Sequence, residues 1–165
     1  TYNGAFALTM ASRCSQVEAI DLSSQALQRA EINAQLNGIS NVAFREANCF
    51  DALREFEAAG RRFDTIVLDP PAFAKDRRSV DAALRGYKEI NLRSLKLLRP
   101  GGYLITCSCS HHISEAEFLQ MLADASVDAH RQLSIVERRI QSRDHPVLLT
   151  VPETLYIKCF IVSTL

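Results

Sequence analysis

The fold of this chain is decided by one stretch of sequence, Phe63-Asp64-Thr65-Ile66-Val67-Leu68-Asp69-Pro70-Pro71. Residues 63–68 are nearly all apolar, which is typical of a strand buried on both faces in the middle of a parallel sheet. The two prolines stiffen the backbone after the strand and remove two N–H donors. The strand therefore ends at Asp69, and we predict a rigid turn there whose carbonyl groups can accept hydrogen bonds from a ligand.

Helical and extended patterns alternate along the rest of the chain. We predict strands at residues 17–21, 42–46, 103–109, 133–140 and 155–162. We predict the end of a first helix at residues 7–13, and further helices from Ser23 or Ser24 to Asn37-Gly38, at 50–59, at 80–98 and after Ser114. This alternation predicts an α/β fold with a doubly wound, Rossmann-like, mostly parallel sheet. No helix separates the last two strands, so we expect them to form an antiparallel pair.

Composition excludes several classes of protein. The 165 residues are 47% apolar and 23% charged, which suits a single globular domain over residues 1–165. No apolar run approaches the ~20 residues of a membrane span, so we expect no membrane role. The net charge of zero excludes nucleic-acid binding by bulk basicity alone. An odd number of irregularly spaced cysteines, five in all, favours a reducing cytoplasm over a disulfide scaffold.

Positive charge is nevertheless concentrated around the Asp-Pro-Pro turn. Residues 61–100 contain ten Lys or Arg and five Asp or Glu, a local balance of +5. The sequence supports two interpretations of this charge equally: a solvated helix face, or a surface beside the Asp-Pro-Pro turn that faces RNA phosphates.

Ligands of such sheets bind at the carboxyl ends of the strands, which selects three places. The first follows Asp21, where a Rossmann-type site uses an acid to bind ribose hydroxyls; the alternative role of Asp21 is helix capping. A dehydrogenase is disfavoured because residues 1–6 lack G-x-G-x-x-G. The second is the Asp69 turn, where Phe73 offers a face for stacking a base or, alternatively, fills the core. Lys75, Arg77 and Arg78 beside it are phosphate candidates, and a plain surface loop explains them equally well.

The third place is Thr106-Cys107-Ser108-Cys109-Ser110-His111-His112. Alternation along a strand puts Cys107 and Cys109 on one face. We do not expect a metal site, because structural zinc draws ligands from two separate pairs and no second cluster occurs in the sequence. The remaining interpretations are two inert buried cysteines, or a nucleophile at the end of the strand. The sequence does not say whether His111 or His112 faces a thiol.

The residues in these places resemble a known family. Residues 63–75 look like the fourth motif of class I S-adenosylmethionine-dependent methyltransferases, and residues 98–105 resemble the entry to their fifth strand. With residues 106–112 and 143–146, the chain resembles the bacterial 23S ribosomal RNA cytosine-C5 methyltransferases whose full chains carry an N-terminal PUA domain. The likeness covers nearly all 165 residues.

The resemblance implies a role for each candidate residue. S-adenosylmethionine would be the cofactor, and ribosomal RNA the substrate. Cys109 would be the nucleophile, and Asp69 would contact both the cofactor and the target cytosine. Asn48 stands where the family usually has an acid near the adenine. The implied cofactor-binding residues are Asn3, Gly4, Asp21, Leu22, Ser23, Asn48, Cys49, Asp69 and Pro70. The implied substrate-binding residues are Pro71, Phe73 and Lys75.

The resemblance also implies that the chain is a fragment of a longer protein. Thr1 would lie just after the first strand of the family's sheet, so the strands at 17–21 and 63–68 would lack their shared neighbour. We therefore expect weak cofactor binding by the chain alone, or completion of the sheet by a homodimer or a strand swap. Two other functions stay open: methylation of an amino group of RNA or DNA, which needs no cysteine, and a non-catalytic RNA-binding or assembly module with a relic cofactor pocket.

Overall fold

The computed structural model of the protein describes residues 1–74 and 76–165. These residues divide into two compact units, Thr1–Glu55 and Phe56–Leu165, which are described in turn. The helices are α1 (Ala5–Ala11), α2 (Ser24–Leu36), α3 (Cys49–Ala58), α4 (Val80–Leu97) and α5 (Glu115–Asp128), with short 3-10 turns η1 (Arg77–Ser79) and η2 (Pro152–Thr154). The strands are β1 (Val17–Asp21), β2 (Val42–Glu46), β3 (Phe63–Leu68), β4 (Leu98–Ser108), β5 (Leu133–Arg139) and β6 (Lys158–Thr164).

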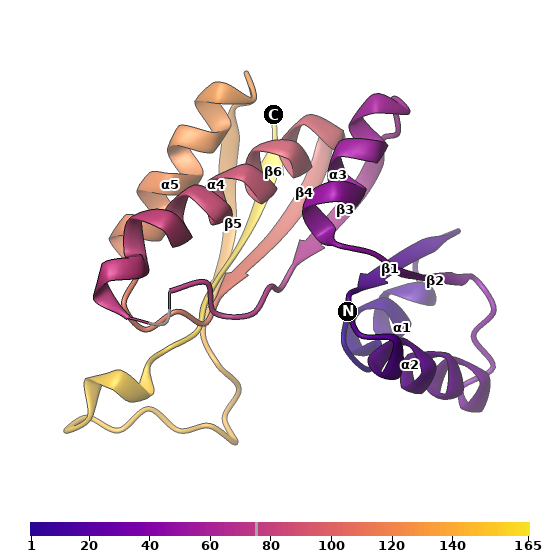
Figure 1. The fold of residues 1–165 in the computed structure, drawn as a ribbon, viewed down its shortest axis with the longest axis horizontal. Coiled ribbons are helices and arrows are strands. Elements are labelled where there is room, and N and C mark those ends of the chain that lie inside the picture. Colours follow the sequence, from indigo (N-terminus) through magenta and orange to yellow (C-terminus); the bar gives the residue numbers. More distant parts are fainter. Residues whose placement is uncertain (75) are drawn as a thin grey trace. The chain divides into compact units, whose positions relative to one another are not determined.

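The first unit is built on a parallel pair of strands, β1 and β2, with α1 and α2 packed against them (Figure 1). Helix α2 begins where predicted, because the Ser23 hydroxyl accepts a hydrogen bond from the Ala26 N–H and caps the helix. It ends at Leu36 with Asn37 as its C-cap, and Gly38 follows with a φ of +63°. The stripe of Ala26, Leu27, Ala30 and Ala34 is buried, as its helical spacing indicates.

The second unit is a four-stranded sheet in the order β3-β4-β6-β5. Strands β3 and β4 are parallel, whereas β6 runs antiparallel to both β4 and β5. Helices α4 and α5 pack side by side along one face of this sheet (Figure 1). Their core side chains, which include Tyr87, Leu95 and Phe118, are completely buried. The predicted α/β architecture and the antiparallel pairing of the last two strands are confirmed.

The described strands lie in two sheets rather than one, because β1 pairs only with β2 and β3 pairs only with β4.

Some predicted boundaries were wrong. Helix α1 ends at Ala11 rather than at residue 13, and β4 begins at Leu98 rather than at 103. Leu98 already pairs with Phe63, and the next pair joins Thr65 to Tyr103, so residues 99–102 form an irregularity inside the ladder. Strand β6 begins at Lys158 rather than at 155, because η2 precedes it and leaves Leu155 half exposed.

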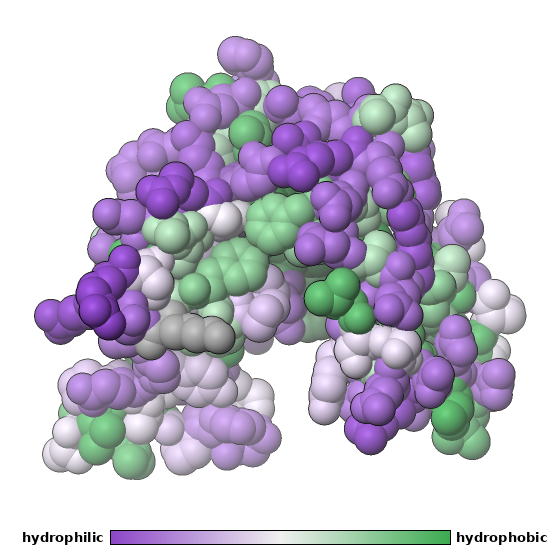
Figure 2. Space-filling model, viewed as in Figure 1, coloured by the Kyte–Doolittle hydropathy of each residue, from purple (hydrophilic) through white to green (hydrophobic). Residues whose placement is uncertain are grey.

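The connection from β5 to β6 projects from the second unit (Figure 1). It exposes several large apolar side chains, and Figure 2 shows apolar surface on this lobe at the lower left. The exposed residues are Val147, Leu148, Leu149, Val151 and Leu155.

Candidate functional site

The first unit positions Asp21 at the carboxyl end of β1, as predicted. One carboxylate oxygen accepts hydrogen bonds from the Tyr2 N–H at 2.7 Å and the Thr1 amino group at 2.9 Å. The other accepts the Ser23 N–H at 3.0 Å. Burial acts to raise the pKa of Asp21, but the backbone hydrogen bonds from Ser23 and Tyr2, together with the hydrogen bond and the charge of the Thr1 amino group, outweigh it and hold the pKa at about 2. The carboxylate is therefore ionised at neutral pH and anchors the loop of residues 2–4 beside the end of β1.

Asn3 and Gly4 form the loop that enters α1. Gly4 has a φ of +89°, and a Cβ added there would lie 3.1 Å from the Cβ of Ala30, so the position requires glycine. The Asn33 amide donates to the Asn3 backbone carbonyl at 3.1 Å. The side-chain oxygen of Asn3 is buried, and no described residue donates a hydrogen bond to it. Such a buried acceptor suits a ligand donor such as the amino group of a methionine moiety.

The remaining cofactor candidates of this unit lie at the ends of β1 and β2. Leu22 is 69% exposed, so it is available to an adenine ring. The Asn48 side-chain oxygen accepts the Phe50 N–H at 2.9 Å and so caps α3, which leaves the amide NH₂ of Asn48 as its donor group. Cys49 is exposed at the first turn of that helix.

The second unit brings the Asp69 turn together with the end of β4. Leu68 is in register with Thr106 across the parallel pair, so Asp69 leaves β3 beside Cys107. Asp69 keeps exposed surface, yet partial burial of its carboxyl raises its pKa. Phe73 packs on the fully buried ring of Tyr87, with the ring centroids 4.5 Å apart. One face of the predicted stacking residue is therefore in contact with the protein itself.

The two candidate cysteines have different surroundings in the structure. Cys107 is buried and faces Cys159 across the antiparallel β4–β6 pair. A hydrogen bond with the Cys159 thiol, together with burial, raises the pKa of Cys107, so this thiol stays protonated. Cys109 lies one residue beyond the end of β4 and is only partly buried. Cys109 is therefore the accessible thiol of the pair.

A buried lysine beneath this segment was missed by the sequence analysis. Lys158, the first residue of β6, donates hydrogen bonds from Nζ to the carbonyls of Ser110 at 2.7 Å and Ile113 at 2.8 Å. Burial lowers the pKa of Lys158, and a thiolate at Cys109 acts in the opposite direction. The register of β4 and β6 brings Lys158 opposite Ser108, and this long-range pairing leaves no local signal in the sequence.

Several of the basic residues in 61–100 are ion-paired. Lys88 contacts Asp128 at 2.8 Å, Arg93 contacts Glu57 at 2.6 Å, and Arg99 contacts Asp64 at 2.7 Å. For these residues, the contacts favour the interpretation that the positive charge of residues 61–100 belongs to a solvated helix face. Lys75, one of the predicted phosphate candidates, lies outside the described residues.

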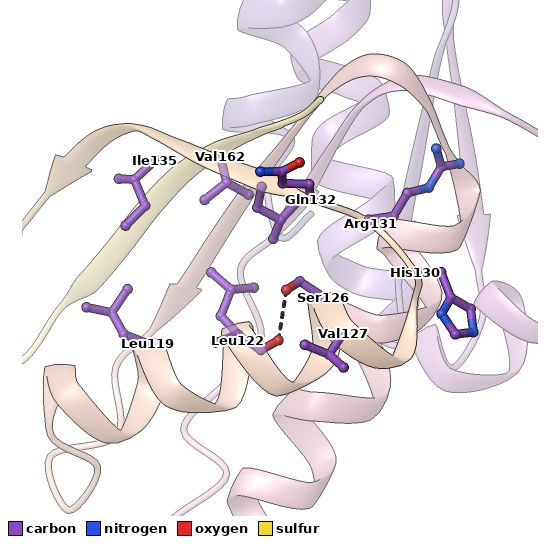
Figure 3. Close-up of a pocket in the computed structure, with 11 residues that line it drawn as sticks. Leu119, Leu122, Ser126, Val127, His130, Arg131, Gln132, Ile135 and Val162 are labelled. Carbon is purple, nitrogen blue, oxygen red and sulfur yellow. Dashed lines mark hydrogen bonds between the residues drawn. The ribbon is translucent and has the colours of Figure 1, made fainter.

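A hollow of about 520 Å³ lies on the opposite side of α5 from α4, between α5 and the sheet edge (Figure 3). Leu119, Leu122 and Val127 of the helix and Ile135 of β5 line it. None of the predicted site residues contributes to this hollow. The candidate site is therefore the strand-end cluster and not this hollow.

The strand order, the acid at the end of β1 and the Asp-Pro-Pro turn define an α/β methyltransferase fold. Residues 3–149 match the family model described as Methyltransferase domain, and the chain belongs to this family. Membership agrees with S-adenosylmethionine as the predicted methyl donor. None of the helices in the described part of the chain has the length and apolarity that a bilayer span requires.

Two relatives share much of the sequence. The chain is 41% identical over 163 residues to "Ribosomal RNA large subunit methyltransferase I" of Klebsiella pneumoniae (strain 342), covering 97% of this chain and 41% of the relative. It is 42% identical over 160 residues to the protein of the same name in Shewanella denitrificans, covering 95% and 40%. The chain therefore spans about two-fifths of the length of these relatives.

A solved structure supports the fold alone. The crystal structure of SMU.776 in complex with SAH superposes with a TM-score of 0.85 at 17% identity, covering 98% of this chain and 42% of that one.

Proposed function

We propose that this chain is the catalytic domain of an S-adenosylmethionine-dependent methyltransferase that forms 5-methylcytosine in 23S ribosomal RNA. The observation that carries the proposal is that Asp69 and a partly exposed Cys109 follow the carboxyl ends of two neighbouring parallel strands, β3 and β4. The names of the relatives supply the ribosomal RNA substrate. A reducing cytoplasm, expected from the cysteine count, suits such a substrate.

The first unit would hold the cofactor. Bound S-adenosylmethionine supplies an electrophilic methyl group. The ionised Asp21 would accept hydrogen bonds from its ribose, Leu22 and Asn48 would border its adenine, and the unpartnered oxygen of Asn3 would accept from its amino group. Gly4 allows the backbone to approach closely. Ser23 and Cys49 are the further cofactor-binding residues that we propose in this unit. In the second unit, Asp69 and Pro70 are the residues that we propose to contact the cofactor.

The second unit would activate the base. Cytosine C5 is too weak a nucleophile to take a methyl group unaided. The Cys109 thiolate would add to C6 and push electron density to C5, while Asp69 hydrogen-bonds N3; its raised pKa favours the protonated form that donates there. After C5 has gained the methyl group, a base removes the C5 proton and the thiolate leaves. The target base must leave its stack to reach Cys109. Pro71, Phe73 and Lys75 would border the flipped base.

The test is covalent trapping by RNA that carries 5-fluorocytosine at the target position, which blocks release of the adduct. The natural full-length protein and its Cys107→Ser variant should form the adduct, whereas Cys109→Ser should not. Trapping that needs Cys107 and survives the loss of Cys109 would reverse the assignment of the nucleophile. An enzyme that methylates RNA without trapping, and that tolerates Cys109→Ala, would be the amino-group methyltransferase. A protein that binds RNA but no S-adenosylmethionine in calorimetry would be the non-catalytic module.

A further inference from the structure

Cys109 is flanked by two serines that take part in a closed ring of buried hydrogen bonds. The Ser110 N–H donates to the Ser108 hydroxyl at 3.3 Å, and that hydroxyl donates to the Tyr87 hydroxyl at 3.1 Å. The Tyr87 and Ser110 hydroxyls are 3.0 Å apart and close the ring. All three residues have no exposed surface. Since buried polar groups are costly unless paired, the ring holds the backbone on both sides of Cys109 in one arrangement.

The same ring reaches the Asp69 turn. The Ala74 N–H, directly after Phe73, donates to the Ser110 hydroxyl at 3.2 Å. The Phe73 ring also packs on Tyr87. Ser110 therefore links the segment that follows Asp69 to the segment that holds Cys109, through hydrogen bonds that cross 36 residues of sequence.

Lys158 secures the other side of Ser110. Its ammonium donates hydrogen bonds to the carbonyls of Ser110 and Ile113, which fixes the turn that follows Cys109. Ser110 thus uses its N–H, its carbonyl and its hydroxyl in contacts with Ser108, Lys158, Tyr87 and Ala74. No other residue of the candidate site joins both loops in this way among the described hydrogen bonds.

We propose that Ser110, with Tyr87 and Ser108, is a positioning residue that fixes Cys109 and the Asp69 turn at the separation the reaction requires. The inference rests on the proposed function, since it takes Cys109 as the nucleophile. Positioning acts on the chemical step, because small displacements of reacting groups lower the rate more than they weaken ground-state binding. Loss of the ring should therefore lower kcat and leave RNA and cofactor affinity intact.

The variants are Ser110→Ala, Ser110→Thr and Tyr87→Phe in the natural full-length protein. Ser110→Ala removes the hydroxyl, Ser110→Thr retains it, and Tyr87→Phe removes a hydroxyl while keeping the ring that packs on Phe73. The matched control is Ser94→Ala. Ser94 is equally buried, lies in the same helix as Tyr87, and its hydroxyl has no partner among the described residues.

The measurements are kcat, KM for RNA, the cofactor Kd and the rate of 5-fluorocytosine adduct formation. Ser110→Ala and Tyr87→Phe should each lower kcat and the trapping rate at least ten-fold, with KM and Kd changed less than two-fold. Ser110→Thr should recover most of the rate, and Ser94→Ala should match the wild type. The double variant Ser110→Ala, Tyr87→Phe should be no slower than Ser110→Ala alone, because both changes break the same ring of hydrogen bonds.

Two results would overturn the inference, and they are distinguishable. If the wild type traps RNA, and Ser110→Ala and Tyr87→Phe trap it equally fast or lose only thermal stability, the ring does not position the nucleophile. If the wild type itself forms no adduct, the C5 mechanism fails and the inference fails with it. Should Ser110→Ala not fold, Tyr87→Phe carries the same test.

Discussion

The ionisation of Asp21 gives the most quantitative prediction. Its pKa is about 2, against an ordinary value of 3.8, so the folded first unit stabilises the ionised carboxylate relative to the protonated carboxyl. At ~1.4 kcal/mol for one pKa unit, the ionised carboxylate stabilises the fold by about 2 kcal/mol. About 24% of the side chain is exposed, and the value of about 2 kcal/mol allows for screening by solvent there. Because the folded pKa is the lower one, the stabilisation is complete above about pH 4 and is lost as the pH falls toward 2.

Asp21→Asn should therefore cost about 2 kcal/mol of unfolding free energy at pH 7, and below about 0.5 kcal/mol at pH 2. Urea denaturation of the 165-residue chain, followed through amide resonances of residues 1–55, measures both values. Glu31→Gln is the control, since Glu31 is exposed in the same unit. An equal cost at both pH values, or a carboxyl carbon resonance of Asp21 that titrates near 3.8, would refute the reasoning.

The same carboxylate has a second predicted role. If Asp21 also binds ribose, Asp21→Ala should weaken S-adenosylmethionine binding at least ten-fold in calorimetry of the natural full-length protein, since hydrogen bonds to charged groups are worth about 1.5–3 kcal/mol each. RNA affinity should be unchanged. An unaltered cofactor Kd would leave Asp21 with the structural role alone.

Asp69→Ala should abolish methyl transfer without unfolding the protein, as circular dichroism and a tritium-transfer assay would show; near-normal turnover would remove Asp69 from the site. Gly4→Ala should destabilise the first unit by roughly 1–3 kcal/mol, because of the strained φ and the close approach to Ala30; unchanged denaturation midpoints would contradict this. At pH 7.5, iodoacetamide should label Cys109 at least ten-fold faster than Cys107, because the pKa of the buried Cys107 thiol is raised; peptide mapping that finds equal rates would contradict the assignment of the accessible thiol.

Local sequence patterns were sufficient for the elements and for the ends of the strands. The apolar run at 63–68 and the helix caps at Ser23 and Ser114 all depend on neighbours within a few residues, so their sequence signals are reliable. Asp21 and Asp69 were found because carboxyl ends of parallel strands are where such folds place polar groups.

Pairing across the sheet was decided only in three dimensions. The start of β4 at Leu98, the buried pair of Cys107 with Cys159 and the position of Lys158 all follow from register between strands that are distant in sequence. Register depends on side chains of the partner strand, which no local window contains.

The sequence by itself thus determined the fold class, the order of its elements and the acids at its strand ends, because those follow from periodicity and turn chemistry along the chain. The tertiary structure alone decided which cysteine is accessible and which hydroxyls surround it. Burial and hydrogen bonding are properties of the packed interior, where Ser110 meets Ala74, Tyr87 and Lys158 from three separate parts of the chain.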